Sequence, residues 1–200
     1  MKKSIVLSVV MFFMVAAGFS QHLSVNAFGG YTFQDKINFN NAYTYINAGG
    51  MFGASVEGVN AQGTALELLY QYQSTKTPTT TYIPNATVNP STVISYLLLN
   101  FEQYLLNNPK IQPYGGLGLG AAFYKSDYPN STSATKFAWD IKAGVKFKMS
   151  SSVGIKIGAQ LLSSSQATGN AFYYGYVYTT YATILQFGFT GGLVFDLGGH

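Results

Sequence analysis

The chain is poor in the residues that a water-soluble protein needs on its surface. Charged residues make up 9% of its 200 residues, against about 25% in an ordinary soluble domain. It contains no cysteine, which excludes disulfide bonds, thiolate metal sites and a lipid-modified cysteine anchor. It also lacks arginine, so lysine supplies all eleven basic side chains. This is not the clustered Arg and Lys pattern of a protein that binds nucleic acid.

Long hydrophobic runs are also missing after the N-terminal region. No stretch there approaches the 18 or so apolar residues of a membrane-spanning helix. Yet hydrophobic residues make up 48% of the chain and aromatic residues 16%. A closed β-barrel is the other structure that pairs every backbone group within a membrane. High apolar content without a helical span therefore favours a transmembrane barrel.

Residues 1–20 have the pattern of a secretory signal peptide. Lys2 and Lys3 precede a mostly apolar run over 5–19, and Gly18 and Ser20 are small residues before the expected cleavage at Gln21. An N-terminal membrane anchor is the alternative, but the run is short for a full span. The remaining residues, 21–200, are predicted to form one barrel domain.

The segment 183–197 shows most clearly what kind of element builds this domain. Leu185, Phe187, Phe189 and Leu193 share one face, while the other face is mostly small or polar. Such a period of two is produced by a β-strand and not by a helix. Similar alternation predicts eight strands, over 22–33, 46–56, 64–73, 92–103, 112–124, 135–148, 152–162 and 183–197.

The connections between these strands alternate in length. Long loops are expected at 34–45, 74–91, 125–134 and 163–182, and short turns at 57–63, 104–111 and 149–151. Long loops at one end and short turns at the other are typical of bacterial outer-membrane barrels. The predicted fold is all-β, an eight-stranded antiparallel up-and-down transmembrane β-barrel. Eight strands would return both mature termini to the periplasmic side.

A soluble β-sandwich also alternates, but with its apolar face inward. Two features speak against it: the polar faces are mostly Gly, Ser, Thr and isolated charges, and the aromatic residues gather near strand ends. Two interfacial girdles are predicted from these aromatics. They comprise Tyr31, Phe33, Tyr72, Phe123, Phe137 and Trp139 at the long-loop end, and Phe101, Phe147 and Phe195 at the short-turn end.

Charged residues are concentrated on the faces that would point into the barrel. An eight-stranded barrel has an interior just wide enough for side chains, and buried charges must be paired or hydrated. We therefore expect an ion-pair network that fills the lumen and leaves no channel. Its predicted members are Glu57, Glu67, Glu102, Asp140, Lys142, Lys146, Lys156 and Asp196.

Four stretches carry a resemblance to a known family: 27–43, 113–123, 136–147 and 184–195. They resemble the small outer-membrane β-barrel proteins often labelled "porin family", and the architecture is similar to OmpA- and OmpX-type eight-stranded barrels. The resemblance implies a Gram-negative outer membrane and a partner in the barrel-insertion machinery, but no catalytic motif. One departure is that Leu197 stands where such barrels usually end on an aromatic residue, followed by Gly198, Gly199 and His200.

Catalytic, cofactor and metal sites are not expected. Barrel enzymes usually place a histidine with Ser, Asp or Glu near the membrane edge or outer rim. The two histidines, His22 and His200, would both lie at the periplasmic end, away from the long loops. Asp35 and Asp127 leave an aspartate-only mechanism open, although isolated loop acids are usually just solvated.

The functional hypothesis is a structural or surface-interacting barrel; a narrow porin and a lipid-modifying enzyme are the alternatives. Expected partners are outer-membrane lipid and an extracellular partner bound by the long loops. The last loop is especially rich in aromatic residues, which either pack at the rim or form an adhesive surface. These residues are Phe172, Tyr173, Tyr174, Tyr176, Tyr178 and Tyr181.

Overall fold

The computed structural model describes residues 22–38, 42–82, 85–129, 133–165 and 183–197, with Ser165 described by its backbone alone. Over these residues the secondary structure is entirely β, with twelve strands. No helix in the described part of the chain is long and apolar enough to cross a membrane. The signal-peptide prediction at 1–20 and the aromatic residues of 172–181 lie outside the described residues.

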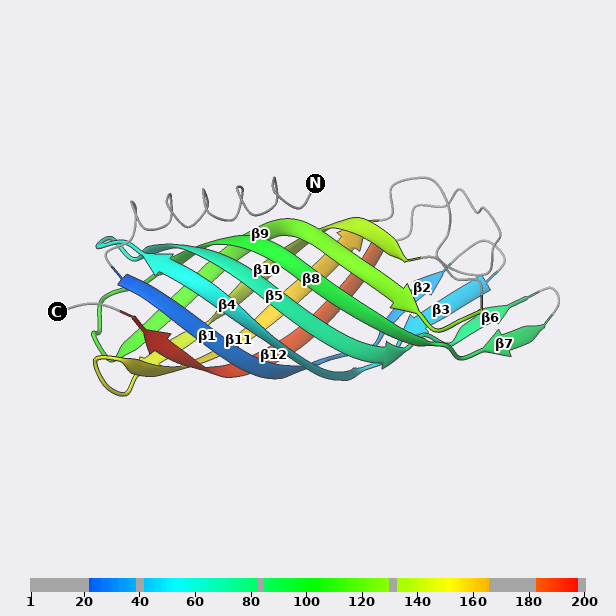
Figure 1. Ribbon diagram of the computed structural model, residues 1–200, viewed down its shortest axis with the longest axis horizontal. Helices are drawn as coiled ribbons and strands as arrows, with labels where there is room; N and C mark the ends of the chain where they lie inside the picture. Colours follow the sequence, from blue (N-terminus) through cyan, green and yellow to red (C-terminus); the bar gives the residue numbers. More distant parts are fainter. Residues whose placement is uncertain (1–21, 39–41, 83–84, 130–132, 166–182, 198–200) are drawn as a thin grey trace.

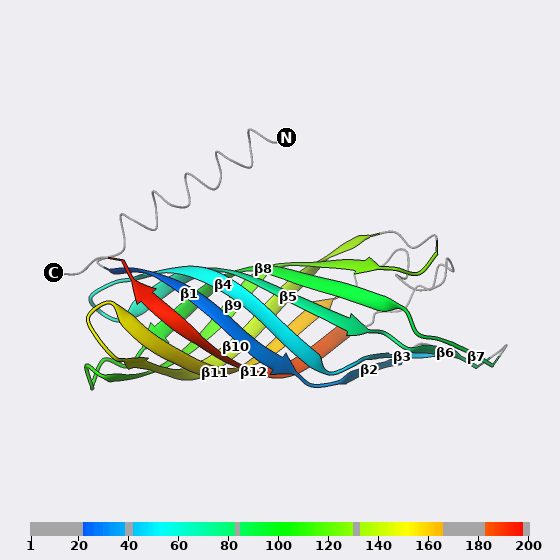
Figure 2. The same ribbon diagram turned by 60° about the horizontal axis from the view of Figure 1, so that its bottom comes forward.

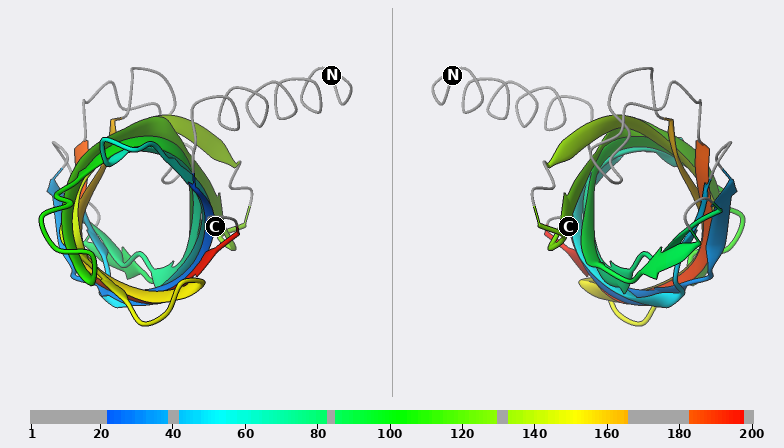
Figure 3. Two further views of the ribbon diagram at one scale, coloured as in Figure 1. Left: turned by 90° about the vertical axis from the view of Figure 1, so that its left-hand side faces the viewer. Right: turned by 90° about the vertical axis from the view of Figure 1, so that its right-hand side faces the viewer.

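Eight long strands close into one antiparallel barrel, which confirms the predicted fold (Figures 1 and 2). Closure depends on β1, which pairs with β4 on one side and with β12 on the other. Seen along its axis, the barrel is a closed ring (Figure 3). Its strands are β1 (His22–Thr32), β4 (Gly49–Val59), β5 (Thr64–Lys76), β8 (Ser91–Tyr104), β9 (Ile111–Ser126), β10 (Ala134–Lys148), β11 (Val153–Ser165) and β12 (Thr183–Asp196).

The two faces of each strand divide as the alternation predicts. In β12 the outer residues Leu185, Phe187 and Phe189 are 45%, 42% and 51% exposed. The intervening residues Ile184 and Gln186 point into the lumen and are almost fully buried. The barrel therefore has an apolar outer wall, the reverse of a soluble β-sandwich.

Each short turn at one end of the barrel is organised by a single polar side chain. Asn60 Oδ1 accepts the backbone N–H groups of Gln62 and Thr64, and Gly63 completes that turn with a φ of 82°. Asn108 accepts two backbone N–H groups in the next turn, and Ser150 accepts two in the third. Such side-chain bonds favour tight reversals. This end is called the short-turn end below.

The opposite, long-loop end departs from the prediction. The expected loops 34–45 and 74–91 contain a second, four-stranded sheet in the order β2-β3-β6-β7, which extends beyond the barrel (Figure 1). Its strands are β2 (Asp35–Asn38), β3 (Ala42–Ile46), β6 (Thr79–Thr81) and β7 (Ala86–Val88). The loop prediction was wrong here because threonines and tyrosines, read as loop residues, also suit paired strands. The predicted strand over 46–56 is correspondingly split, since Ile46 ends β3 and β4 begins at Gly49.

Glycines in the wall make room for aromatic side chains inside the barrel. Phe28 of β1 lies across Gly53 and Gly192, its two cross-strand partners. Tyr114 of β9 reaches over Gly144 and Gly158 on the next two strands. A methyl group at any of these four glycines would come within 3.0 Å of the aromatic side chain. Glycine in these strands is therefore a packing requirement, because a Cβ would occupy the space of an inward ring.

We expect Gly144→Ala to destabilise the folded barrel by about 1–3 kcal/mol, the usual cost of overpacking. The new methyl would clash with the Ile157 carbonyl oxygen and would lie 2.7 Å from the Tyr114 hydroxyl. Gly191→Ala is the matched control, because nothing lies within 4 Å of the added methyl there. Denaturant unfolding followed by Trp139 fluorescence measures both. Equal losses of stability would contradict this account of the glycines.

Candidate functional site

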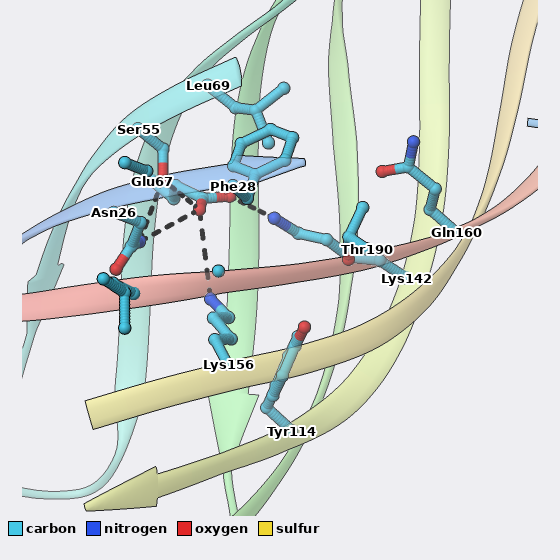
Figure 4. Close-up of a pocket in the computed structure, with 13 residues that line it drawn as sticks. Asn26, Phe28, Ser55, Glu67, Leu69, Tyr114, Lys142, Lys156, Gln160 and Thr190 are labelled. Carbon is cyan, nitrogen blue, oxygen red and sulfur yellow. Dashed lines mark hydrogen bonds and ion pairs between the residues drawn. The ribbon is translucent and has the colours of Figure 1, made fainter. Parts of the chain in front are cut away.

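The centre of the lumen holds a cluster of five charged side chains, one from each of five strands. Lys142 of β10 pairs with Glu67 of β5 and lies 2.5 Å from Glu102 of β8. Lys156 of β11 lies 2.8 Å from Glu102 and 3.1 Å from Glu57 of β4. Lys156 also approaches Glu67 at 3.9 Å. The two lysines thus tie one side of the barrel to the opposite side (Figure 4).

Neutral polar groups add hydrogen bonds to the central cluster. Ser55 donates to Glu67 at 2.6 Å, and the Asn100 amide donates to the other oxygen of Glu67 at 2.8 Å. The Asn26 amide donates to Glu57 at 3.1 Å and to Ser55 at 2.9 Å. The carboxylate of Glu67 is 3% exposed, so these bonds replace the water that a free carboxylate would hold.

The eight residues predicted for the lumen network do not form one continuous network. Lys146 and Asp196 make a separate pair at 2.9 Å nearer the short-turn end. Asp140 is 1% exposed beside the central cluster, but neither of its oxygens accepts a hydrogen bond from any described residue. Its Oδ1 and the Asn100 Oδ1 both lie over Gly118, where no side chain occupies the space.

Two tyrosines bound the central cluster on its short-turn side. The rings of Tyr104 and Tyr114 are 5.4 Å apart, and the Lys156 ammonium lies 4.3 Å from the centre of the Tyr114 ring. A cation so placed is attracted by the ring's negative face. Beyond these rings, a cavity of about 140 Å³ opens at the short-turn mouth, with His22, Gln112, Lys146 and Lys148 in its lining.

An apolar layer fills the lumen on the long-loop side of the cluster. Gln160 and Gln71 also lie on the long-loop side of the cluster, where the Gln160 amide donates to the Gln71 side-chain oxygen at 2.9 Å. Ile37 of β2 and Ile46 of β3, which belong to the second sheet, complete the apolar layer. Its other buried members are Leu69, Ile94, Tyr96, Leu98, Ala122, Tyr124, Ala138, Leu162 and Ile184.

The lumen prediction was incomplete on this point. It expected ion pairs to fill the barrel, whereas the long-loop half is filled by the apolar layer and by buried neutral polar side chains such as Gln73, Ser164 and Gln186. A signal for the layer was present in the segment that became β8, where Ile94, Tyr96 and Leu98 alternate with apolar neighbours such as Leu97 and Leu99. A strand that is apolar on both faces has both faces covered.

Little space remains between these side chains. The pocket beside Glu67, Lys142 and Lys156 has a volume of about 30 Å³. One water needs roughly 10–15 Å³ by this measure, so the pocket has room for about two. Between these described side chains of the central cluster, this pocket therefore holds water and not a larger solute.

The residues predicted to form two girdles all lie on the outer face of the barrel. Phe137 is 55% exposed and Phe101 57%, whereas Trp139 is half-buried between neighbouring strands. The long-loop group is larger than predicted, because Phe187 and Phe189 stack around Phe33 with centroids 5.8 and 5.9 Å away. Tyr31, Tyr72, Phe123, Phe147 and Phe195 also lie on this face.

The carboxylates of the two acids considered for catalysis accept hydrogen bonds from the backbone. Asp35 Oδ2 accepts the N–H of Leu185 at 2.8 Å, and Asp127 Oδ1 accepts the N–H of Ser91 at the same distance. His22 begins β1 at the short-turn end, and His200 lies outside the described residues. Within the described ranges, no group of three or more His, Cys, Asp or Glu side chains could hold a metal ion.

Comparison with known proteins agrees with this architecture. The family model for the outer membrane protein beta-barrel domain matches residues 5–179. The chain belongs to this family. No curated protein matches the sequence.

Solved outer-membrane barrels have the same fold. OprG from Pseudomonas aeruginosa is 10% identical with a TM-score of 0.60, covering 90% of this chain and 97% of OprG. Neisserial surface protein A is 14% identical with a TM-score of 0.59, covering 88% and 97%. The N-terminal barrel of P. aeruginosa OprF is 15% identical with a TM-score of 0.50, covering 89% and 98%. At these identities the likeness extends to the fold alone.

We expect Glu67→Ala to destabilise this outer-membrane barrel by about 3–5 kcal/mol, because it removes one partner of a buried ion pair. Pairing the change with Lys142→Met measures the coupling between the two side chains, because Lys142 keeps Glu102 as a partner in the single variant. Lys110→Ala, in an exposed turn, is the control and should change stability by less than about 0.5 kcal/mol. Guanidinium unfolding in detergent provides the measurement. A Glu67→Ala variant as stable as the control would show that the cluster contributes nothing.

Proposed function

We propose that this chain is a non-conducting barrel of a Gram-negative outer membrane, with a structural or surface-interacting role at its long-loop end. The apolar outer wall contacts membrane lipid, and both mature termini lie on the periplasmic side. The barrel-insertion machinery is a partner during assembly. The partner outside the cell binds the connections 34–45, 74–91, 125–134 and 163–182.

The single observation that supports a closed barrel is the filling of the lumen. Two different layers cross it in series: the central cluster around Glu67 and the apolar layer around Tyr96. Ions would have to cross a layer whose apolar side chains are 0–4% exposed, without a ring of charge of one sign to select them. This argues against the narrow porin, although the 140 Å³ cavity at the short-turn mouth admits small molecules to that end.

The lipid-modifying enzyme receives less support than the surface role. Asp35 and Asp127 are the described acids nearest the long-loop end, and each accepts a backbone hydrogen bond from a neighbouring strand. A general base also requires a position beside the substrate. The role that we assign to both aspartates is to fix the start of β8 and β12.

The second sheet supports a surface role. It extends beyond the barrel at the long-loop end (Figure 1), with Ile37 and Ile46 buried on one face. The other face carries Tyr43 and Tyr45, whose rings are 5.6 Å apart. Tyrosine presents a large amphipathic contact area at low entropic cost. A buried face and a tyrosine face together make a stable platform for contacts outside the cell.

Single-channel recording tests the closed barrel. We expect the full-length protein in planar bilayers at neutral pH to give no conductance steps, because the two layers block the lumen. The heat-dependent shift of the same preparation in gel electrophoresis checks that the inserted protein is folded. Reproducible steps of one size from folded protein would favour the porin instead.

Lysine substitution tests the lipid contact. Ile141 lies in the middle of β10 and is 47% exposed on the outer wall. Ile141→Lys should cost about 2–4 kcal/mol in a bilayer, whereas Phe137→Lys near the long-loop end of the same strand should cost about 0–1 kcal/mol. Unfolding titrations in lipid vesicles measure the difference. If both changes cost the same, the wall does not lie in lipid at the assigned depth.

A further inference from the structure

The cavity of about 140 Å³ at the short-turn mouth stays open in a lumen that is otherwise filled. This end of the barrel faces the viewer in the left view of Figure 3. The side chain of Tyr104, which is 3% exposed, forms part of the lining and separates the cavity from the central cluster. Since an apolar cavity of about 150 Å³ holds benzene, this one has room for a ligand of about six non-hydrogen atoms.

Three side chains in the cavity lining have hydrogen-bond donors left over. Gln112 of β9 is 8% exposed, and its side-chain amide makes no hydrogen bond with a described residue. Lys148 of β10 is half-buried, and none of the seven acids, all of them described, comes within 4.0 Å of its ammonium. Lys146 is 4% exposed and donates to Asp196 at 2.9 Å. An ammonium has three N–H groups, so Lys146 keeps others for a ligand.

The sheet register places these three side chains side by side. Gln112 and Lys146 are direct cross-strand partners on β9 and β10. Lys148 is two residues further along β10, so its side chain lies on the same face as Lys146, with roughly 7 Å between their Cα atoms. The amide and the two ammonium groups therefore belong to one wall of the cavity.

The balance of charge in the cavity favours an anion. Among the described lining residues Asp196 is the only acid, and its charge is offset by its pairing with Lys146. The ammonium of Lys148 then leaves an excess of positive charge. His22, which also lies in the lining, adds no negative charge. An anion that enters the cavity therefore meets a net attraction, although Asp196 is present.

Much of the remaining lining is apolar. Val59 is the last residue of β4, Ala61 lies in the turn after it, and Leu106 lies in the turn after β8. These side chains and the Tyr104 ring favour contact with hydrocarbon over contact with a hydrated ion. An inorganic anion such as chloride leaves this part of the surface unused. The lining thus matches a ligand with one negative group and a short apolar part.

We propose that this cavity binds a short monocarboxylate, either a free acid anion or the C-terminal carboxylate of a peptide. The carboxylate oxygens accept charge-assisted hydrogen bonds from Lys148, from the free N–H groups of Lys146 and from the Gln112 amide. The aliphatic part of the ligand packs against Val59 and Leu106. That the ligand comes from the periplasm rests on the proposed function, which assigns the short-turn end to that side; the binding itself does not.

Chemical-shift titration of the isotopically labelled full-length protein in detergent micelles tests the site. Butyrate is the probe, and butyramide is its uncharged counterpart. We expect saturable shifts of the backbone amides of Gln112, Lys146 and Lys148 with butyrate, and none with butyramide or with chloride at the same concentration. N-acetyl-alanyl-alanine tests the peptide source. The tighter of the two carboxylates identifies the source of the ligand.

Variants at the short-turn end separate the site from the general charge of that end. Lys148→Gln should weaken butyrate binding about tenfold, the loss of one hydrogen bond to a charged group, and Lys148→Arg should keep most of the affinity. Gln112→Leu, which removes the free amide, should weaken binding about fivefold. The matched control is Lys110→Gln, in an exposed turn outside the cavity lining, and it should change binding less than about twofold because salt screens exposed charges.

An unchanged heat-dependent gel shift checks that each variant is folded. Butyramide shifts equal to those of butyrate, the same shifts with chloride, or equal losses in Lys148→Gln and Lys110→Gln would overturn the proposal. The titration in detergent depends neither on the conductance of the barrel nor on the side of the membrane that the short-turn end faces. The monocarboxylate site and the proposed function can therefore fail independently.

Discussion

Closure of the strand ladder between β1 and β12 is the constraint on which the rest of this structure depends. Once β1 pairs on both sides, no edge remains and every barrel strand has one face inside and one outside. Eight strands leave an interior about as wide as the side chains that line it. The inward residues therefore have to fill a fixed volume, while the outward residues are free to be uniformly apolar.

The two halves of the lumen meet this requirement in different ways. Around Glu67, opposite charges pair and amides donate to the carboxylates, so burial costs less than it would for isolated charges. Around Tyr96, apolar side chains fill most of the space, together with buried neutral polar groups such as Gln73 and Gln186. Glycines in the wall, such as Gly53 and Gly144, let Phe28 and Tyr114 lie flat against the strands. Close packing thus replaces water in most of the barrel.

The same closure shapes the surface at the long-loop end. Because Ile37 and Ile46 complete the apolar layer, the second sheet is held against the barrel mouth by its buried face. Its other face is then fixed in orientation, with Lys36 and Tyr45 continuous with the outer wall of β5. The residues that close the lumen and the residues exposed on the surface therefore lie on opposite faces of the same short strands.

The sequence by itself determined the barrel, its number of strands and the face on which most residues lie. The physical reason is that alternation with a period of two is a local property of a strand. In 183–197 it shows which residues face the lumen and which face outward. Lumen charges such as Glu67 and Lys142 were identifiable in the same way. Partner choice was not, because Lys142 and Glu67 are 75 residues apart and meet only when the ring closes. Asp140 lies on the same inward face yet makes no ion pair. Its position along the barrel axis decides this, and the alternation along the strand does not show that position.

The second sheet was also decided by tertiary structure. Its strands of three to five residues are too short to show a period, and they form only where Ile37 and Ile46 pack against the apolar mouth of the barrel.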